Sequence, residues 1–270
     1  MMKERVTLTI DKQLLDKIDQ SVDGTEYKNR SHVIELLLMK ALSSNRPRKA
    51  IILAGGPSEV RCMMPVLDKP LIEWNIMLLK NHGVKDIIIS IKKSDSSIKN
   101  YFGYGDKYGI KIDYIQEEYP LGTGGSIKAV SEFVKETTIV CNADELKDID
   151  LDDMYEFHKH NNKTCTLALS TVDDPTSYGV AMLNGNRIVT FVEKPPKNSS
   201  PSKLVNAGLY LIEPEVLKYI PDGFSMLEQD VFPILAKEEK LFGYIFSGQW
   251  FPTKTGIDYE HAKKEWRGLK

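Results

Sequence analysis

The sequence "KAIILAGGPSEVRCMMPVLDKPLIEW", Lys49 to Trp74, decides the fold of most of the chain. It opens with "AIILA", a short apolar run typical of a strand buried on both faces of a parallel sheet, and a glycine pair follows directly. A strand that ends in a glycine turn is a usual way to bring backbone N–H groups to the phosphates of a nucleotide. Only "PSEVRC" then separates Gly56 from Met63, so little loop is left for that purpose.

Apolar strand candidates alternate with helical patterns from residue 50 onward. They are "AIILA", a helix over Leu71–Asn81, "DIIISI", a segment around Ser96–Phe102, "IDYIQE", a helix near Ser126, and "TTIVCN". Buried strands alternating with helices predict an α/β domain with a doubly wound, mostly parallel, Rossmann-like sheet. Ligands of such sheets bind at the carboxyl ends of strands, where "LAGG" lies.

Composition limits the class of protein. A chain of 270 residues that is 41% hydrophobic can bury a sizeable core, as one large domain or as a large and a small one. No apolar run is long enough to span a bilayer, and the start, "MMKERVTLTIDKQ", does not resemble a signal peptide. We therefore expect a cytoplasmic protein without membrane contact. Cys62, Cys141 and Cys165 are widely spaced and lie in or beside apolar runs, which predicts buried thiols.

The N-terminal part has its own pattern. In "ERVTLTID", Val6, Leu8 and Ile10 alternate with polar residues, as in a half-buried strand that has no hairpin partner. Asp11 is predicted to cap a first helix, and Ser31 a second one. One strand and two helices cannot form an adequate core alone. The unpaired strand therefore predicts an intertwined homodimer, and a higher oligomer stays open.

Residues 3–43 resemble the ribbon-helix-helix family of DNA-binding proteins, through the strand with its polar outer face, the turn at Gly24 and the "NRS" start of the second helix. This resemblance implies a double-stranded DNA operator as partner, read in the major groove by a paired ribbon. Its base-reading residues map to Arg5, Thr7 and Thr9, and its phosphate contacts to Asn29, Arg30 and Ser31. The simpler interpretation is that the threonines only favour a strand and that Ser31 only caps a helix.

Charge is divided unevenly between the two parts. Residues 1–50 carry ten Lys and Arg against seven Asp and Glu, a net of +3, whereas the rest carries 26 against 31, a net of −5. This imbalance permits nucleic-acid contact but does not establish it. "SSNRPRK" resembles a linker. We expect a DNA-binding and dimerisation domain over 1–43, a basic linker over 44–49 and a large domain over 50–270.

The larger part contains a series of motifs in a fixed order. They are "AIILAGG", "PVLDKPLIEW", "EEYPLGTGGSI", "NAD", "DPTSYGVAML", "FVEKPP", "VNAGLYLIEPEVLKYIP" and "LEQDVFPILA". Through these motifs it resembles the sugar-1-phosphate nucleotidyltransferases, in the style of the mannose or heptose 1-phosphate guanylyltransferase branch, which implies a nucleotidyltransferase-like, sugar-nucleotide-binding domain over 50–270. The resemblance implies nucleotide contacts at Leu53, Gly55, Gly56, Gln116, Pro120, Leu121, Gly122 and Asp144. It implies sugar and sugar-phosphate contacts at Tyr178, Gly179, Glu193, Lys194, Asn206 and Gly208.

Two departures from that family's pattern lie on opposite sides of the implied site. The phosphate-gripping loop has shrunk, Arg61 stands where the signature lysine belongs, and Pro57 lacks an N–H donor. In "QWFPTKTGIDY", Pro252 stands where the family has its second metal-binding aspartate, and Lys254 where it has glycine. Asp144 is the remaining carboxylate, so a Mg²⁺ held there would be weakly bound.

These departures favour binding without turnover. The first hypothesis is a DNA-binding transcriptional regulator whose catalytically degenerate nucleotidyltransferase domain senses a sugar nucleotide or sugar phosphate, with no cofactor required. Arg61 and Asp144 would then be catalytic remnants. The alternative is an active, Mg²⁺-dependent sugar-1-phosphate nucleotidyltransferase in which Arg61 and Lys254 neutralise charge and the N-terminal part dimerises or autoregulates. A third is that the large domain is only a scaffold. The "PLGTGG" loop leans toward guanine without deciding the base or the sugar.

Overall fold

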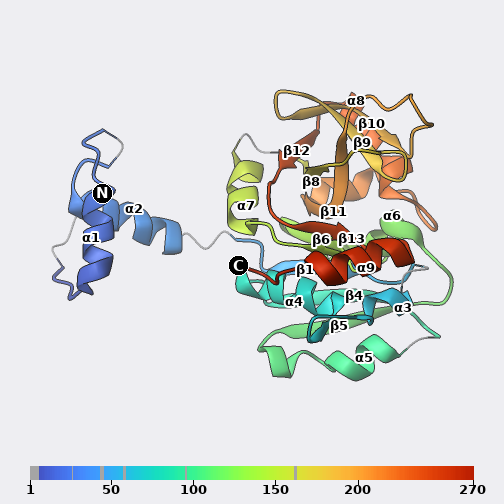
Figure 1. The fold of residues 1–270 in the computed structure, drawn as a ribbon, viewed down its shortest axis with the longest axis horizontal. Coiled ribbons are helices and arrows are strands. Elements are labelled where there is room, and N and C mark those ends of the chain that lie inside the picture. The colour runs from blue at the N-terminus through green and yellow to red at the C-terminus, as the bar shows by residue number, and fades with distance from the viewer. Residues whose placement is uncertain (1–5, 26, 43–45, 57–58, 95, 161–162) are drawn as a thin grey trace. The chain divides into compact units, whose positions relative to one another are not determined.

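The structure, a computed structural model, describes residues 6–25, 27–42, 46–56, 59–94, 96–160 and 163–270 (Figure 1). The chain divides into two compact units, Met1–Arg46 and Pro47–Lys270. The second unit therefore takes in Pro47, Arg48 and Lys49 of the predicted linker. The carbonyl of Arg48 accepts hydrogen bonds from the backbone N–H groups of Lys85 and Asp86.

The small unit contains the helices α1, Lys12–Gln20, and α2, Arg30–Leu42. Asp11 caps α1 as predicted, because its carboxylate accepts from the N–H groups of Gln13 and Leu14 at 2.9 and 3.3 Å. The prediction that Ser31 caps the second helix is wrong. Asn29 precedes α2, and its side-chain oxygen accepts from the N–H of His32 at 3.0 Å, so Ser31 lies inside the first turn.

The predicted N-terminal strand is not seen as a strand in its described residues, 6–10. Val6 and Leu8, which were expected on its buried face, are 71% and 55% exposed. A β-strand takes its hydrogen bonds from a neighbouring strand, and the described part of this unit supplies none. The ribbon-helix-helix assignment therefore stays a prediction.

The described part of the large unit is built on a nine-stranded sheet with the order β5-β4-β1-β6-β11-β8-β12-β10-β9. The strands are β1 Lys49–Leu53, β4 Asp86–Lys92, β5 Lys111–Glu117, β6 Thr138–Asn142, β8 Cys165–Thr171, β9 Gly179–Asn184, β10 Arg187–Glu193, β11 Leu204–Ile212 and β12 Leu241–Ile245. Two short ladders join β2 Pro65–Val66 to β3 Lys69–Pro70, and β7 Glu145–Lys147 to β13 Trp250–Pro252. In Figure 1, β4 and β5 lie at one end of this unit, and β9 and β10 at the other.

Half of the sheet is parallel, as predicted. β1 pairs in parallel with β4 and β6, and β4 with β5. The prediction of a mostly parallel sheet fails beyond β6, because β11 runs antiparallel to both β6 and β8. β9 and β10 form an antiparallel hairpin that turns at Gly185, and a short hairpin connection cannot join parallel strands.

Helices cover both faces of the sheet. They are α3 Glu59–Cys62, α4 Leu71–Asn81, α5 Ser97–Phe102, α6 Gly122–Ala129, α7 Leu151–Lys159, α8 Phe232–Lys237 and α9 Gly256–Glu265, with a π-helix over Leu227–Val231 and 3-10 turns over Asp106–Tyr108, Ser131–Phe133 and Pro214–Lys218. The predicted Leu71–Asn81 helix is confirmed to the residue.

Neighbouring residues of β1 enter different cores. Ile52 belongs to a buried cluster with Ile76 of α4, whereas Ile51 packs in a second cluster with Ile127 of α6 and Phe232 of α8. Each fully buried isoleucine contributes about 1.5 to 3 kcal/mol through burial, which fixes the strand between two helix layers. The doubly wound α/β prediction is therefore confirmed.

The three cysteines are free and buried, as predicted. Among the described residues, no helix has the length and apolar character needed to cross a bilayer.

Candidate active site

The glycine turn after β1 lies directly against a buried carboxylate. A Cβ on Gly55 would stand 2.8 Å from Glu117 Cδ and 2.9 Å from each carboxylate oxygen. Glu117 is 6% exposed and accepts hydrogen bonds from the Ser90 hydroxyl, from Ser126 Oγ at 2.5 Å and from the N–H of Leu121 at 3.1 Å. Glycine at position 55 is therefore needed for the close approach of a carboxylate that is held from three sides.

The side chain at this place is Glu117, whereas the sequence suggested Gln116. Gln116 is exposed, and Glu117 is buried at the end of β5. The alternation that starts at Ile112 would have placed Gln116 on the inner face. The alternation of buried and exposed residues shifts by one position at the half-buried residues Tyr114 and Ile115, and nothing in the sequence predicts that shift.

The loop from Pro120 onward continues the same edge. Gly122 has φ +74°, and its Cβ would stand 2.4 Å from the carbonyl oxygen of Ser225. That carbonyl accepts from the N–H groups of Gly124 and Gly125 at 2.9 and 3.2 Å. The glycines of "PLGTGG" thus fasten the loop to the segment around Ser225. Beside the loop, a pocket of about 350 Å³ is lined by Lys92, Lys93, Ser94, Glu117, Glu118, Tyr119 and Pro120.

Four of the predicted sugar-site residues lie together on the β9–β10 hairpin. Gly179 pairs with Glu193, and a Cβ on Gly179 would stand 2.8 Å from Glu193 Oε2. The carbonyl of Tyr178 accepts from the N–H of Lys194 at 2.9 Å. Lys194 has φ +47°, and its ammonium lies 3.5 Å from Glu193 Oε1. This left-handed backbone at a lysine is an uncommon conformation of the kind that gathers at functional sites.

Asn206 and Gly208 lie at an irregularity of β11, where its register against β8 shifts. Gly208 has φ +61°, and its Cβ would stand 2.7 Å from Asn142 Nδ2 and 2.8 Å from both carboxylate oxygens of Glu145. The Asn206 side chain accepts from the N–H of Gly208 at 3.0 Å and donates to Tyr210 Oη at 2.9 Å. Asn206 therefore positions the glycine.

The carboxylate beside Gly208 was not predicted. Glu145, on β7, is 1% exposed and accepts from the Trp250 indole N–H at 2.8 Å. Trp250 in turn packs edge-on against Tyr178, with ring centroids 5.6 Å apart. Lys147, 2% exposed, donates to the carbonyl of Gly208 at 3.2 Å. Charged residues in a short strand are typical of a surface segment, so no pattern in the sequence predicts that Glu145 and Lys147 are buried.

A second buried carboxylate links the "PLGTGG" loop to β11. Glu228, in the π-helix, accepts from Thr123 Oγ1 at 2.7 Å and from Tyr210 Oη at 3.3 Å. Burial raises the pKa of Glu228, and the hydrogen bond from Thr123 offsets only part of this effect. Since Tyr210 also holds Asn206, this network connects the implied base side to the implied sugar side.

The two positions implied for a metal lie side by side, but they supply only one carboxylate. The carbonyl of Asp144 accepts from the N–H and the hydroxyl of Thr253 at 3.2 and 2.7 Å, and Pro252 pairs with Glu145 in the β7–β13 ladder. Mg²⁺ prefers several oxygen ligands, and proline offers no side-chain oxygen. The side chains at these positions therefore do not fit the two-aspartate Mg²⁺ site that the family resemblance implies.

The two departures from the family pattern touch each other. The guanidinium of Arg61 donates to the carbonyl of Thr253 at 3.2 Å and also to that of Lys254. Lys254 Nζ lies 4.6 Å from the centroid of the Tyr178 ring, within cation–π range. The 252–254 loop is thus held by Arg61 on one side and by Asp144 on the other.

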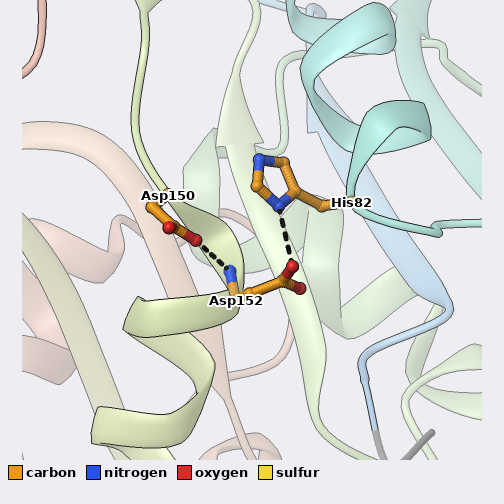
Figure 2. A group of neighbouring side chains, drawn as sticks. All are labelled: His82, Asp150 and Asp152. Carbon is orange, nitrogen blue, oxygen red and sulfur yellow. Dashed lines mark hydrogen bonds and ion pairs between the residues drawn. The ribbon is translucent and has the colours of Figure 1, made fainter. Parts of the chain in front are cut away.

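A separate cluster of possible ligands has a structural explanation. His82 Nδ1 lies 3.6 Å from Asp152 Oδ2, and Asp150 caps α7 by accepting from the N–H groups of Asp152 and Asp153 at 2.9 and 3.0 Å (Figure 2). The three side chains offer ligand atoms within 4.8 Å of one another. The contact between His82 and Asp152 and the helix cap at Asp150 account for the arrangement.

The predicted DNA contacts are only partly described. Arg5 lies outside the described residues, and Thr7 and Thr9 are exposed. Arg30 makes a bidentate ion pair with Asp19, in which Nε lies 2.7 Å from Oδ1 and Nη2 lies 2.6 Å from Oδ2. This ion pair occupies the guanidinium in the structure, and the phosphate contact predicted for Arg30 stays a prediction.

Curated relatives are enzymes by name. The mannose-1-phosphate guanylyltransferase of Mycobacterium tuberculosis is 31% identical over 224 residues, which cover 78% of this chain and 62% of that protein. A probable mannose-1-phosphate guanylyltransferase of Arabidopsis thaliana is 35% identical over 206 residues, covering 72% and 62%. The chain thus spans about 62% of the length of these relatives.

Solved structures share the fold. A putative glucose-1-phosphate thymidylyltransferase from Bacillus anthracis, in complex with a sucrose, superposes with a TM-score of 0.75 at 23% identity, over 82% of this chain and 96% of that one. A UDP-glucose pyrophosphorylase complexed with UDP-glucose gives a TM-score of 0.70 at 20% identity, over 81% and 97%.

These findings correct the first hypothesis. A DNA-binding regulator with a catalytically degenerate sensor domain is contradicted by relatives, 31–35% identical over most of the chain, that are named as sugar-1-phosphate guanylyltransferases. The hypothesis gave two altered positions more weight than the matching motifs around them. Residues 49–266 match the family model described as "Nucleotidyl transferase", and the chain therefore belongs to the nucleotidyl transferase family.

Proposed function

We propose that the large unit is an active sugar-1-phosphate guanylyltransferase, which joins GTP and a sugar 1-phosphate into a GDP-sugar and releases pyrophosphate. The observation that carries this proposal is the sugar side of the site, where Glu193 meets Gly179 and the buried Glu145 meets Gly208. The names of the relatives favour guanine as the base and mannose 1-phosphate as the sugar substrate.

In this reaction an oxygen of the sugar phosphate attacks the α-phosphorus of GTP. The bond from that phosphorus to the bridging oxygen breaks, and pyrophosphate leaves with the electron pair. Gly55 would let the nucleotide approach the β1 turn, and Glu193 would accept hydrogen bonds from sugar hydroxyls. Lys194 would neutralise negative charge on the phosphates. Neutralising that charge is the main way in which such a transfer is accelerated.

Glu117 supports guanine as the base. Its buried carboxylate lies under Gly55 and lines the 350 Å³ pocket beside the "PLGTGG" loop. Its Oε1 already accepts from Ser90 and Ser126 and its Oε2 from Leu121, which leaves one acceptor site on Oε2 for an N–H donor of the Watson–Crick edge of guanine. Uracil and thymine present one N–H between two carbonyls, which would place oxygen against oxygen.

Removal of the Glu193 carboxylate tests the transferase. We expect the wild-type protein to form GDP-mannose from GTP and mannose 1-phosphate, with much less product from UTP or dTTP. Glu193→Ala should lower kcat/KM by about 10- to 100-fold, the effect of losing hydrogen bonds to a charged group worth about 1.5 to 3 kcal/mol. Glu132→Ala, at a side chain that is 92% exposed, is the matched control. A folded wild-type protein without any nucleotidyl transfer would contradict the proposal.

We also propose that the N-terminal unit pairs with a second copy of itself. Val6, Leu8, Leu14, Leu37 and Leu38 are between 47% and 71% exposed, an unusual gathering of apolar side chains in a unit of 46 residues. A second copy would cover them and give the segment around Val6 a strand neighbour, which the described residues of one chain do not supply. Contact of this pair with double-stranded DNA stays a prediction.

Light scattering after gel filtration tests the pairing. We expect the wild-type protein at twice the 30.6 kDa mass of one chain, and Val6→Asp/Leu8→Asp at the mass of one chain. Ile257→Asp, at an 83% exposed residue of the large unit, should leave the mass unchanged. A wild-type monomer at micromolar concentration would refute the dimer. The same samples, mixed with duplex DNA at low and high salt, test the predicted DNA contact.

A further inference from the structure

Lys254 is a lysine where the family pattern has glycine, and its position is fixed by its neighbours. The loop that carries it is tied to Asp144 through two hydrogen bonds of Thr253, and to Arg61 through the carbonyls of Thr253 and Lys254. The lysine ammonium rests on the face of Tyr178, 4.6 Å from the ring centroid. The side chain therefore points from the implied metal side of the site toward the implied sugar side.

The ammonium of Lys254 has no carboxylate partner among the described residues. Lys194, whose N–H donates to the carbonyl of Tyr178, is paired with Glu193 at 3.5 Å. No ion pair of Lys254 is found within the part of the chain that the structure describes. An aromatic face holds a lysine in place without neutralising its charge. A cation kept in this way is available to an anionic ligand.

We propose that Lys254 is a phosphate-binding residue that takes the place of the missing metal–carboxylate pair. This inference rests on the proposed transferase function. Where the family pattern brings a metal between carboxylates and phosphate, this chain has lost one carboxylate at Pro252 and gained a positive side chain two residues later. Lys254 binds the phosphate of the sugar 1-phosphate directly, so substrate binding at this position does not require a divalent metal.

The neighbouring groups suit this role. Tyr178 is braced by Trp250, whose indole N–H is bound to the buried Glu145 beside Gly208. The ring under Lys254 and the floor of the sugar pocket are thus parts of one packed unit. A sugar that lies beside Gly208 would present its 1-phosphate toward Tyr178 and Lys254. Arg61 acts as a positioning residue, since its hydrogen bonds go to the loop.

Calorimetric titration with mannose 1-phosphate in excess EDTA tests the inference. We expect the wild-type protein to bind the sugar phosphate without metal, and Lys254→Gln to bind it about 10- to 100-fold more weakly, as for the loss of a charge-assisted hydrogen bond. Lys254→Arg should recover most of the affinity. Lys263→Gln is the matched control, because Lys263 also lies over a tyrosine ring, that of Tyr259 at 5.3 Å, but pairs with Glu260.

Further titrations, with mannose and with a double variant, distinguish the possible explanations of this binding. Mannose without phosphate should bind equally to the wild type and to Lys254→Gln, and Pro252→Asp/Lys254→Gly should bind mannose 1-phosphate only when Mg²⁺ is present. Wild-type binding that requires Mg²⁺, or equal affinities of wild type and Lys254→Gln, would overturn the inference even if GDP-mannose is formed. Metal-free binding that depends on Lys254, in a protein that forms no GDP-mannose, would support the phosphate site and refute the proposed turnover.

Discussion

Gly208→Ala is expected to lower transferase activity by at least about 100-fold while the protein still folds. The new methyl group would stand 2.7 to 2.8 Å from the amide of Asn142 and from both carboxylate oxygens of Glu145. Glu145 cannot withdraw freely, since it is 1% exposed and held by Trp250. The side chains of Asn142 and Glu145 beside Gly208 would have to move, and small misplacements in an active site lower the rate strongly.

A matched glycine separates the backbone effect from the contact effect. Gly185 has φ +59°, close to the +61° of Gly208, but nothing lies within 4 Å of its Cβ position. Gly185→Ala should therefore cost only the left-handed strain, about 1 to 2 kcal/mol of stability, and leave kcat and KM near their wild-type values. Equal activity of the two variants would show that crowding at Glu145 has no part in the reaction.

Much of the fold was predictable because its signals are local. "AIILA" and "DIIISI" are continuous apolar runs, and the helix at Leu71–Asn81 has a clear beginning and end. The antiparallel half of the sheet was missed because the direction of a strand such as β11 depends on connections and partners far away in the chain. The cap at Asn29 was missed because Ser31, two residues later, is an equally good capping residue type.

The glycines of the site could be predicted from their motifs, but the buried carboxylates beside them could not. Gly55 and Gly208 were named from the sequence, but Glu117 and Glu145, which make glycine necessary at these positions, were not. A carboxylate is usually exposed, so a sequence pattern assigns it to the surface. Pro252 was interpreted as a loss, and Lys254 was given a charge-neutralising role only in the alternative hypothesis. The hydrogen bonds from Arg61 to the carbonyls of Thr253 and Lys254 in this loop depend on the tertiary structure.

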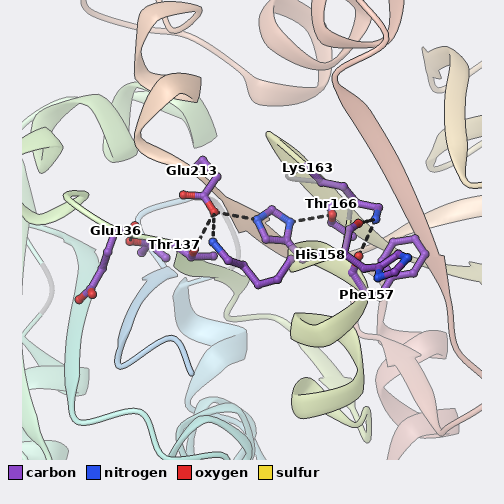
Figure 3. Close-up of polar contacts among 10 residues, drawn as sticks. Glu136, Thr137, Phe157, His158, Lys163, Thr166 and Glu213 are labelled. Atoms are coloured by element: carbon purple, nitrogen blue, oxygen red, sulfur yellow. Dashed lines mark hydrogen bonds and ion pairs between the residues drawn. The ribbon is translucent and has the colours of Figure 1, made fainter. Parts of the chain in front are cut away.

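Among the substitutions proposed in the large unit, Glu213→Ala is expected to lower the free energy of unfolding most. One carboxylate oxygen accepts from Thr137 Oγ1 at 2.7 Å, from His158 Nε2 at 3.2 Å and from Lys159 Nζ at 3.3 Å (Figure 3). His158 is fully buried, and its other ring nitrogen meets Thr166 Oγ1 at 2.8 Å. Loss of the carboxylate leaves these groups without their acceptor, which costs about 2 to 4 kcal/mol, or a fall in Tm of roughly 5 to 15 °C.

Acid should remove the same contribution in the wild-type protein. Burial alone would raise the pKa of Glu213, but hydrogen bonds from His158 and Thr137 and the charge of Lys159 lower it to about 2, from 4.5. A carboxyl with a lowered pKa stabilises the fold above pH 4.5, and this stabilisation is lost as the pH falls toward 2. Burial also lowers the pKa of His158, so protonation of the unfolded chain below its ordinary value of 6.5 favours unfolding as well.

Urea unfolding of the wild type and of Glu213→Ala between pH 7 and pH 3 measures both effects. The difference in unfolding free energy should be largest near pH 7 and shrink below pH 4.5, because the unfolded wild-type chain then binds a proton that the folded chain still excludes. Glu132→Ala removes an ion pair of similar geometry, with Lys135 at 2.9 Å, from a side chain that is 92% exposed, and should change stability little at any pH. A constant difference across this range would mean that Glu213 acts through packing and that its charge is irrelevant.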